Sequence, residues 1–149
     1  MHSEIDERAV RVIRRLQGDG YDAFLVGGCV RDMLMGRRIH DYDAATSALP
    51  EQVTALFENT VPTGIRHGTV TVWMDGLGVE VTTFRSESVY TDGRHPDAVR
   101  FERSIEADLA RRDFTVNAMA LSADGKIIDM FGGRADIERR ILRTVGDPA

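Results

Sequence analysis

The chain has 149 residues, of which 42% are hydrophobic and 29% are charged, and its formal net charge is −5 with a pI near 5.3. This composition is typical of one soluble globular domain; with no apolar run of membrane-spanning length and a polar, acidic start, it predicts a cytoplasmic protein with no membrane partner. The negative charge argues against a domain that holds nucleic acid by overall charge alone, and the single cysteine, Cys29, excludes an internal disulfide and a thiolate zinc site.

The first half of the chain alternates between helical and strand patterns. Apolar residues at helical spacing predict an amphipathic helix over residues 3–17, with Gly18 as its stop. The following predicted elements are a buried strand over 21–26, a helix over 29–35, a strand over 40–46 and a helix over 50–59 with Pro50 in its first turn.

The second half contains the clearest hairpin, with alternating strands over 68–74 and 79–85 around a glycine-bearing turn. Residues 88–99 are polar and read as a mobile loop, and 98–102 as another strand. Ser104 is expected to cap a helix that runs through residue 113 and continues over 114–121. A strand over 126–130 and a closing helix over 134–143 complete a mixed α and β order around one sheet.

Two carboxylates, Asp41 and Asp43, lie two residues apart on a predicted strand. Their side chains therefore leave the same face, while Tyr42 points to the other. Two adjacent like charges become favourable when a divalent cation binds between them, and oxygen ligands of this kind suit Mg²⁺. A solvated strand end or a helix N-cap explains an isolated pair of this spacing equally simply.

Glu80 lies between Val79 and Val81 in an alternating strand, so it faces away from both valines. If this strand neighbours Asp41 and Asp43, Glu80 completes a three-carboxylate site for two metal ions. An exposed residue on the polar face of a sheet has the same spacing.

Gly27 and Gly28 lead from a strand into a helix, where backbone N–H groups and the positive helix end favour an anion. Arg31 follows one turn later with a cationic head, and Asp32 is expected to brace an arginine or to cap the helix. A glycine pair is also typical of tight packing without any ligand.

Arg111, Arg112 and Asp113 are predicted to lie mid-helix, with Asn117 one turn after Asp113. Adjacent arginines on a helix point about 100° apart, so we expect Arg112 to reach a phosphate and Arg111 to be structural or solvent-facing. Ordinary surface pairing with Glu106 and Asp108 is the alternative.

Three segments together resemble one family, the head domain of bacterial class II tRNA CCA-adding enzymes and poly(A) polymerases, within the DNA polymerase β-like nucleotidyltransferases. These segments are LVGGCVRDMLMGRRIHDYDAAT, RRDFTVNAMA and IIDMFGGRADIERRILRTVGDP, and the likeness runs from about residue 5 to the C-terminus. The implied fold is α+β, with a mixed antiparallel sheet of about five strands flanked by helices.

The resemblance implies an enzyme, a tRNA nucleotidyltransferase that transfers CMP or AMP from CTP or ATP to the 3′ end of tRNA with Mg²⁺ as its cofactor. Asp41 and Asp43 would ligate the metal, and Glu80 matches a third catalytic carboxylate. The implied nucleotide-binding residues are Gly27, Gly28, Arg31, Arg112, Asp113 and Asn117. Residues 88–99 correspond to a loop that helps the family switch from C to A addition.

Members of the family continue into neck, body and tail domains, which select the base and hold the tRNA. None of these is expected in the 149 residues, so we expect the whole chain, residues 1–149, to be an isolated catalytic head. The same motifs serve poly(A) polymerases and enzymes that add only CC or only A. A head that binds Mg-nucleotide without efficient turnover is a further alternative.

Overall fold

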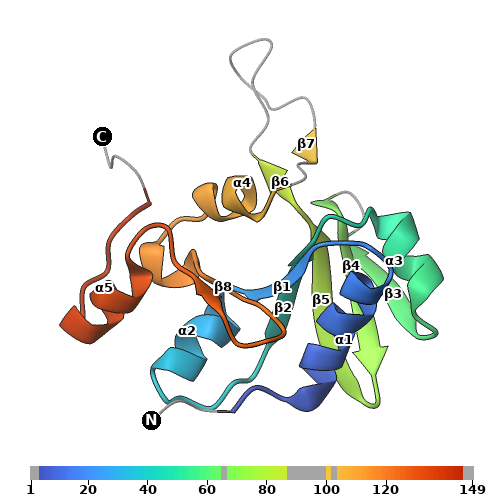
Figure 1. Cartoon of the computed structure of the whole chain (residues 1–149), viewed down its shortest axis with the longest axis horizontal. Coiled ribbons are helices and arrows are strands. Elements are labelled where there is room, and N and C mark those ends of the chain that lie inside the picture. The colour runs from blue at the N-terminus through green and yellow to red at the C-terminus, as the bar shows by residue number, and fades with distance from the viewer. Residues whose placement is uncertain (1–3, 65–66, 87–99, 102–103, 146–149) are drawn as a thin grey trace.

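A computed structural model of the chain describes residues 4–64, 67–86, 100–101 and 104–145. Its helices, as labelled in Figure 1, are α1 (Glu7–Gly18), α2 (Gly28–Leu34), α3 (Pro50–Leu56), α4 (Ile105–Ala110), the 3₁₀ helix η2 (Thr115–Asn117) and α5 (Gly133–Arg139). Its strands are β1 (Ala23–Val26), β2 (Tyr42–Thr46), β3 (Thr60–Gly64), β4 (Thr69–Met74), β5 (Leu77–Thr83), β6 (Arg85–Ser86), β7 (Arg100–Phe101), β8 (Ala120–Leu121) and β9 (Ile127–Ile128). The loop predicted over 88–99 lies outside the described residues.

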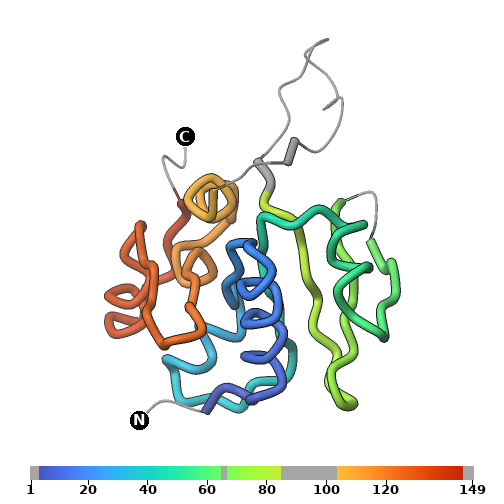
Figure 2. Tube along the Cα trace, turned by 45° about the vertical axis from the view of Figure 1, so that its right-hand side comes forward, coloured from blue at the N-terminus to red at the C-terminus, as the bar shows by residue number. Residues whose placement is uncertain are grey.

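Seven strands form one sheet in the order β3-β4-β5-β2-β1-β8-β9, and β6 pairs with β7 separately. Strands β2 and β5 run parallel, and the other paired strands described here are antiparallel. The predicted α+β class with a mixed sheet is confirmed, with seven strands where about five were expected. The sheet's two ends differ: β3 and α3 lie at one, and the C-terminal segment packs at the other (Figure 2).

One face of the sheet is closed by helices α1, α2 and α3. The apolar side of α1, formed by Ala9, Val12, Ile13 and Leu16, is fully buried against the alternating residues of the central strands. Asp6 caps this helix by accepting a hydrogen bond from the backbone N–H of Arg8, so the helix begins at Glu7 rather than at residue 3. The larger hydrophobic core therefore lies on this face.

The opposite face is covered over only part of its width. Helix α4 contributes Ile105 and Leu109 to a second apolar cluster with Val26, Ala45 and Phe84. The Ser104 hydroxyl accepts a hydrogen bond from the backbone N–H of Ala107, which confirms the predicted cap. This cluster lies over β1 and β2, and no helix among the described residues covers β5, β4 and β3 on the same face.

The predicted hairpin is confirmed, and its turn explains its register. Asp75 and Gly76 have φ values of 47° and 87°, as a two-residue type I′ turn requires. Leu77 consequently pairs with Met74 and Glu80 with Thr71.

Strand β3 has no counterpart among the predicted elements. Its sequence, TVPTG, contains a proline and a glycine, both of which are unfavourable in a strand interior. The strand lies at the edge of the sheet, where a missing proline N–H costs no ladder hydrogen bond, and its register with β4 shifts between Val61 and Gly64.

The helix predicted over 114–121 is wrong. Helix α4 ends at Ala110, a single 3₁₀ turn follows at η2, and β8 then pairs with β1. Ala, Met and Leu in this segment favour a helix, but pairing with β1 places Ala120 and Leu121 in the two cores, and this tertiary gain overrides local propensity. Arg111, Arg112 and Asp113 therefore follow a helix end instead of lying within a helix.

The closing helix is shorter than the predicted 134–143, because α5 ends at Arg139 and Arg140 adopts a left-handed conformation. The chain then turns back, and Arg143 donates a hydrogen bond to the buried carboxylate of Asp136 and another to the carbonyl of Phe131. Asp136 also accepts a hydrogen bond from the Thr115 hydroxyl. These contacts fix the C-terminal segment against η2.

In the part of the chain that the structure describes, no helix combines the length and the hydrophobicity needed to cross a membrane.

We predict that Gly133→Ala destabilises the fold. A Cβ atom at this position would lie 2.3 Å from the backbone oxygen of Thr115, so α5 and η2 must separate. The expected loss is about 1–3 kcal/mol in the free energy of unfolding, measured by urea denaturation. Gly18→Ala is the matched control, because a Cβ there meets nothing within 4 Å, and it should leave stability unchanged or slightly raised. Equal stability of the two variants would contradict this account.

Candidate active site

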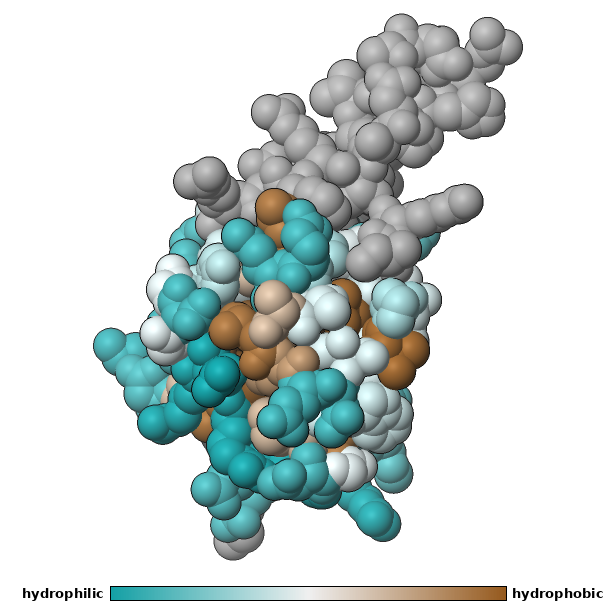
Figure 3. Space-filling model, turned by 90° about the vertical axis from the view of Figure 1, so that its right-hand side faces the viewer, coloured by the Kyte–Doolittle hydropathy of each residue, from teal (hydrophilic) through white to brown (hydrophobic). Residues whose placement is uncertain are grey.

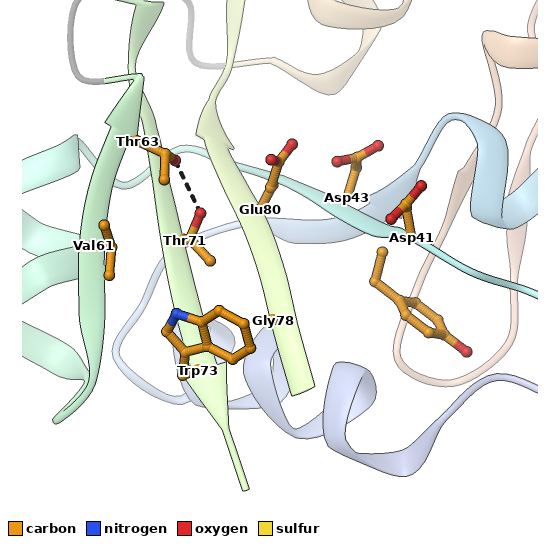
Figure 4. Close-up of a pocket in the computed structure, with 9 residues that line it drawn as sticks. Asp41, Asp43, Val61, Thr63, Thr71, Trp73, Gly78 and Glu80 are labelled. Atoms are coloured by element: carbon orange, nitrogen blue, oxygen red, sulfur yellow. Dashed lines mark hydrogen bonds between the residues drawn. The ribbon is translucent and has the colours of Figure 1, made fainter. Parts of the chain in front are cut away.

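A row of directly paired residues crosses the open part of the sheet and carries the predicted carboxylates. Thr71 on β4 pairs with Glu80 on β5, Glu80 pairs with Asp43 on β2, and Asp43 pairs with Val26 on β1. Paired residues on adjacent strands project to the same face. Asp43 and Glu80 therefore lie side by side, as Figure 4 shows, and the predicted neighbourhood of these strands is confirmed.

Tyr42 fixes the orientation of the two aspartates. Its side chain is buried in the larger core, and its hydroxyl accepts a hydrogen bond of 2.9 Å from the backbone N–H of Asp6. Because neighbouring residues alternate, Asp41 and Asp43 are turned to the opposite, open face. Asp41 itself immediately precedes β2 rather than lying within it.

The crowding of carboxylates changes the acidity of Asp43. Burial raises its pKa to about 6, and the negative charge of Glu80, a hydrogen bond with Glu80 and the charge of Asp41 act in the same direction. Arg112 opposes the shift. Holding Asp43 ionised in this position therefore costs folding free energy, which a bound cation would offset.

An open groove of about 550 Å³ extends from these carboxylates across β5 towards β3. Besides Tyr42 and the three carboxylates, the lining comprises residues that no sequence motif marked, namely Val61, Thr63, Thr71, Trp73 and Gly78 (Figure 4). The hydroxyls of Thr63 and Thr71 are hydrogen bonded at 2.9 Å. The alternation of β4 contained the signal, because Thr71 and Trp73 alternate with the buried Val70 and Val72, as Glu80 alternates with Val79 and Val81 on β5.

Gly27 brings a cation next to the carboxylates. Its φ of 73° is a conformation that side chains rarely adopt. A Cβ atom there would lie 3.3 Å from Nη1 of Arg112 and 4.0 Å from Oδ2 of Asp43. The missing side chain thus leaves room for the Arg112 guanidinium beside Asp43.

Arg31 is fixed on the other side of the glycine pair. Its Nε donates to Asp32 at 3.1 Å, and its Nη1 donates to the side-chain oxygen of Asn117 at 2.9 Å. Asp32 therefore braces an arginine, which is one of the two roles predicted for it. A Cβ on Gly28 would lie 3.2 Å from Nη2 of Arg31, so this glycine also gives an arginine room.

Arg111 and Arg112 share one carboxylate. Asp108 is fully buried and accepts hydrogen bonds from Nε of Arg111 at 3.4 Å and from Nη2 of Arg112 at 3.3 Å. The pairing with Asp108 that the sequence offered is therefore confirmed, but it is buried instead of lying on the surface, and the mid-helix placement is wrong. Burial lowers the pKa of Arg112, which still stays protonated because its ordinary value is so high.

The predicted site residues thus fall into two groups. Asp41, Asp43, Glu80, Gly27, Gly28, Arg31, Arg112 and Asn117 lie around the start of α2 and the open sheet face. Asp113 is exposed, and its described contact is a backbone one, from the N–H of Val145 to its carbonyl oxygen. Nothing described joins the Asp113 side chain to the others.

The donor set suits a hard divalent cation, since it consists of carboxylate oxygens. Over the described ranges, no group of three His, Cys, Asp or Glu side chains is arranged to hold an ion by itself. A Mg²⁺ ion needs only one or two protein carboxylates when waters and substrate phosphates supply the other ligands. Asp41 and Asp43 fit that requirement.

Comparison with known proteins identifies similar chains. The family described as "Poly A polymerase head domain" matches residues 23–143. The CCA-adding enzyme of Levilactobacillus brevis is 54% identical over 142 residues, which are 95% of this chain and 36% of that protein. The chain thus spans about a third of the length of the curated relatives it matches.

Solved structures show the same fold. The CCA-adding enzyme of Bacillus stearothermophilus, crystallised in complex with CTP, matches with a TM-score of 0.86 and 52% identity over 94% of this chain and 33% of that one. A tRNA nucleotidyltransferase complexed with a primer tRNA and an incoming ATP analogue matches with a TM-score of 0.71 and 30% identity over 91% of this chain and 39% of that one.

We predict that Asp43→Asn stabilises the protein at neutral pH without added metal, because asparagine mimics the neutral form that the folded state favours. In the folded protein the pKa of Asp43 is about 6, against an ordinary value of 3.8. The cost that the ionised Asp43 imposes on the free energy of unfolding is therefore complete above pH 6. This cost declines as the pH falls from 6 to 4 and vanishes below pH 4. After discounting for solvent screening, the gain at pH 7 is on the order of 1 kcal/mol.

Thermal unfolding between pH 4 and 8 measures this effect. The melting temperature of Asp43→Asn should exceed that of the unmodified protein by about 2–4 °C at pH 7, and the gap should close towards pH 4. Asp113→Asn, which changes an exposed aspartate, is the matched control and should shift little. A constant gap at every pH would show that the cost of ionising the buried Asp43 carboxylate is not its cause.

Proposed function

Because the chain belongs to the poly(A) polymerase head domain family, we propose that it is the catalytic part of a tRNA nucleotidyltransferase. In this reaction the 3′-hydroxyl of a tRNA attacks the α-phosphorus of CTP or ATP. A new P–O bond forms, the bond to pyrophosphate breaks, and the hydroxyl proton leaves. The names of the relatives, CCA-adding enzymes at 54% identity, favour CCA addition over poly(A) synthesis.

One observation carries the proposal: the pairing of Asp43 with Glu80, next to Asp41 and within reach of Arg112. Carboxylates for a metal and a cation for phosphates lie at one place on an open sheet face. Phosphoryl transfer depends mainly on positioning and charge stabilisation, and this arrangement supplies both.

Asp41 and Asp43 are the residues that would hold Mg²⁺. When bound, the ion would lower the pKa of the acceptor hydroxyl and neutralise charge on the transferred phosphoryl group. Glu80 adjoins Asp43 on the side of the groove, and we assign it the third acidic position, where the proton of the acceptor hydroxyl departs. Burial first, and then the neighbouring charges of Glu80 and Asp41, raise the pKa of Asp43, which agrees with three acidic groups gathered at this place.

Arg31 and Arg112 would hold the triphosphate. Both are pre-positioned, Arg31 by Asp32 and Asn117 and Arg112 by Asp108. Within the described residues, Nε of Arg112 is buried without a hydrogen-bond partner. A donor in that state is costly unless a ligand satisfies it. Gly27 and Gly28 add no side chains that would keep a triphosphate away.

The remaining functions belong, in this proposal, to protein beyond the matched segment. The chain covers 36% of its first relative, and we assign base selection and tRNA grip to the neck, body and tail of a full-length family member. The net charge of −5 agrees with a head that leaves most of the grip on tRNA to those parts. A tRNA substrate and one unpaired cysteine support a cytoplasmic location.

Removing the aspartates should abolish transfer. With Mg²⁺, a tRNA lacking its 3′ CCA and labelled CTP or ATP, the protein should incorporate label, and Asp41→Ala/Asp43→Ala should lose at least about 10³-fold in rate because the metal has no ligands. Glu51→Gln/Glu138→Gln, which removes two exposed charges elsewhere, is the control and should retain activity.

Two outcomes would change the conclusion. Incorporation that survives the double substitution would contradict the assigned site. Mg²⁺-dependent binding of CTP by calorimetry with no incorporation would favour the head that binds nucleotide without turnover.

Asn117→Ala should weaken nucleotide binding without changing the chemical step. Asn117 accepts a hydrogen bond from Arg31, so its loss frees a triphosphate-binding arginine. We expect KM for CTP to rise about 2- to 10-fold with kcat nearly unchanged. A loss confined to kcat would mean that Arg31 acts in the transition state rather than in binding.

A further inference from the structure

The groove beside the carboxylates contains one large aromatic side chain, Trp73. Its side chain is 47% exposed, although tryptophan is among the largest apolar residues. It projects from β4 on the same face as Thr71, two residues away, and Thr71 is paired with Glu80. Along a strand this separation is about 7 Å. Figure 4 shows the ring on the groove floor between Val61 and Gly78.

Gly78 makes room for the ring. Trp73 and Gly78 are paired across β4 and β5, and a Cβ atom on Gly78 would lie 3.1 Å from Cη2 and 3.2 Å from Cζ3 of the indole. The six-membered part of the ring therefore rests against the backbone of β5. One ring face is supported by protein while the side chain stays half exposed.

The described lining of the groove has no positive charge to bind nucleic acid. Its described lining contains three carboxylates, Asp41, Asp43 and Glu80, and no lysine or arginine. The phosphates of a nucleic acid would be repelled here, so an RNA strand that enters the groove must be held by an uncharged interaction. Stacking of a base on an aromatic ring is such an interaction, and it tolerates any base.

The position of the groove indicates which strand would enter. Arg112 lies beside Gly27, on the β1 side of Asp43, whereas Trp73 lies on the β4 side of Glu80. In phosphoryl transfer the attacking and leaving oxygens are roughly in line on opposite sides of phosphorus. If pyrophosphate leaves towards the arginines, the attacking hydroxyl comes from the side of Trp73.

We propose that Trp73 is a stacking platform for a base at the 3′ end of the acceptor RNA, and that it positions the terminal hydroxyl at the carboxylates. The proposal rests on the proposed function and adds to it a binding residue on the acceptor side. Seen from the β3 side, the surface carries apolar and weakly polar groups within a hydrophilic margin (Figure 3).

Trp73 is the only tryptophan in the chain, so its fluorescence reports on this position directly. The probe is a single-stranded RNA of about eight nucleotides that ends in a 3′-deoxynucleotide and so cannot be extended. It is titrated at low salt, and Mg-CTP is titrated separately. We expect RNA to quench the emission.

The contribution of Trp73 to RNA affinity is measured with variants, by fluorescence anisotropy of labelled RNA. Trp73→Ala should raise the Kd for RNA by about 5- to 150-fold, Trp73→Phe should retain most of the affinity, and the Kd for Mg-CTP should not change. Met130→Ala is the matched control, because Met130 is also 47% exposed and lies outside the groove lining. It should leave both affinities unchanged.

Gly78→Ala provides a second variant that does not remove the ring. The added methyl group meets only the far end of the Trp73 side chain, so the ring shifts while the fold is retained. It should reduce both RNA affinity and quenching, with the melting temperature nearly unchanged.

Several results would overturn the proposal. These are RNA binding that Trp73→Ala leaves intact, the absence of any RNA binding, and a weakened Kd for Mg-CTP in place of RNA, which would put the ring under the incoming base. Asp43→Asn separates this proposal from the proposed function. This variant should lose nucleotide transfer and keep the quenching of Trp73 by RNA. If the variant still transfers nucleotide and RNA still quenches Trp73, the catalytic assignment of Asp43 is refuted while the role of Trp73 stands.

Discussion

The parallel pairing of β2 with β5 is the constraint on which the site depends. It places Asp43 opposite Glu80, from segments nearly forty residues apart in the chain. Two adjacent carboxylates repel each other, and the raised pKa of Asp43 reflects its burial first and this repulsion second. The core beneath β2 and β5, with Tyr42, Ala44, Val79 and Val81 all buried, holds the strands together against it.

The cations beside the carboxylates are held by an equally specific arrangement. Asp108 has no exposed surface and accepts hydrogen bonds from both Arg111 and Arg112. A buried carboxylate of this kind contributes little net stability, but it fixes the direction of its partners. Gly27 then supplies the space in which the Arg112 guanidinium lies beside Asp43. Helix α4, which carries Asp108, therefore both covers the smaller core and orients the arginine that lies beside Asp43.

Local patterns predicted much of this structure, and the failures share a cause. Alternation revealed the β4–β5 hairpin and the shared face of Asp41 and Asp43, because both depend on neighbouring residues only. The segment after α4 was wrongly predicted as helix, since Ala120 and Leu121 are drawn into the sheet by β1, nearly a hundred residues earlier. Strand β3 was missed because its edge position, which a single sequence does not reveal, is what tolerates Pro62. Trp73 was overlooked for a related reason, because its importance depends on β3 and Gly78 as neighbours.

The half of the sheet that no described helix covers brings the proposed catalytic residues and the proposed RNA-binding residue onto one surface. A sheet face without a covering helix is in contact with water and therefore carries polar side chains. Here these include threonine hydroxyls that form hydrogen bonds between strands, Thr69 with Thr82 and Thr63 with Thr71, each at 2.9 Å. Water on this face leaves the carboxylates accessible to a metal, and hydroxyls are weak competitors for that ion. Trp73 packs on Gly78 and borders Val61, yet it stays half exposed. Its free ring surface is therefore available to a ligand with a flat apolar face, as the proposed stacking requires.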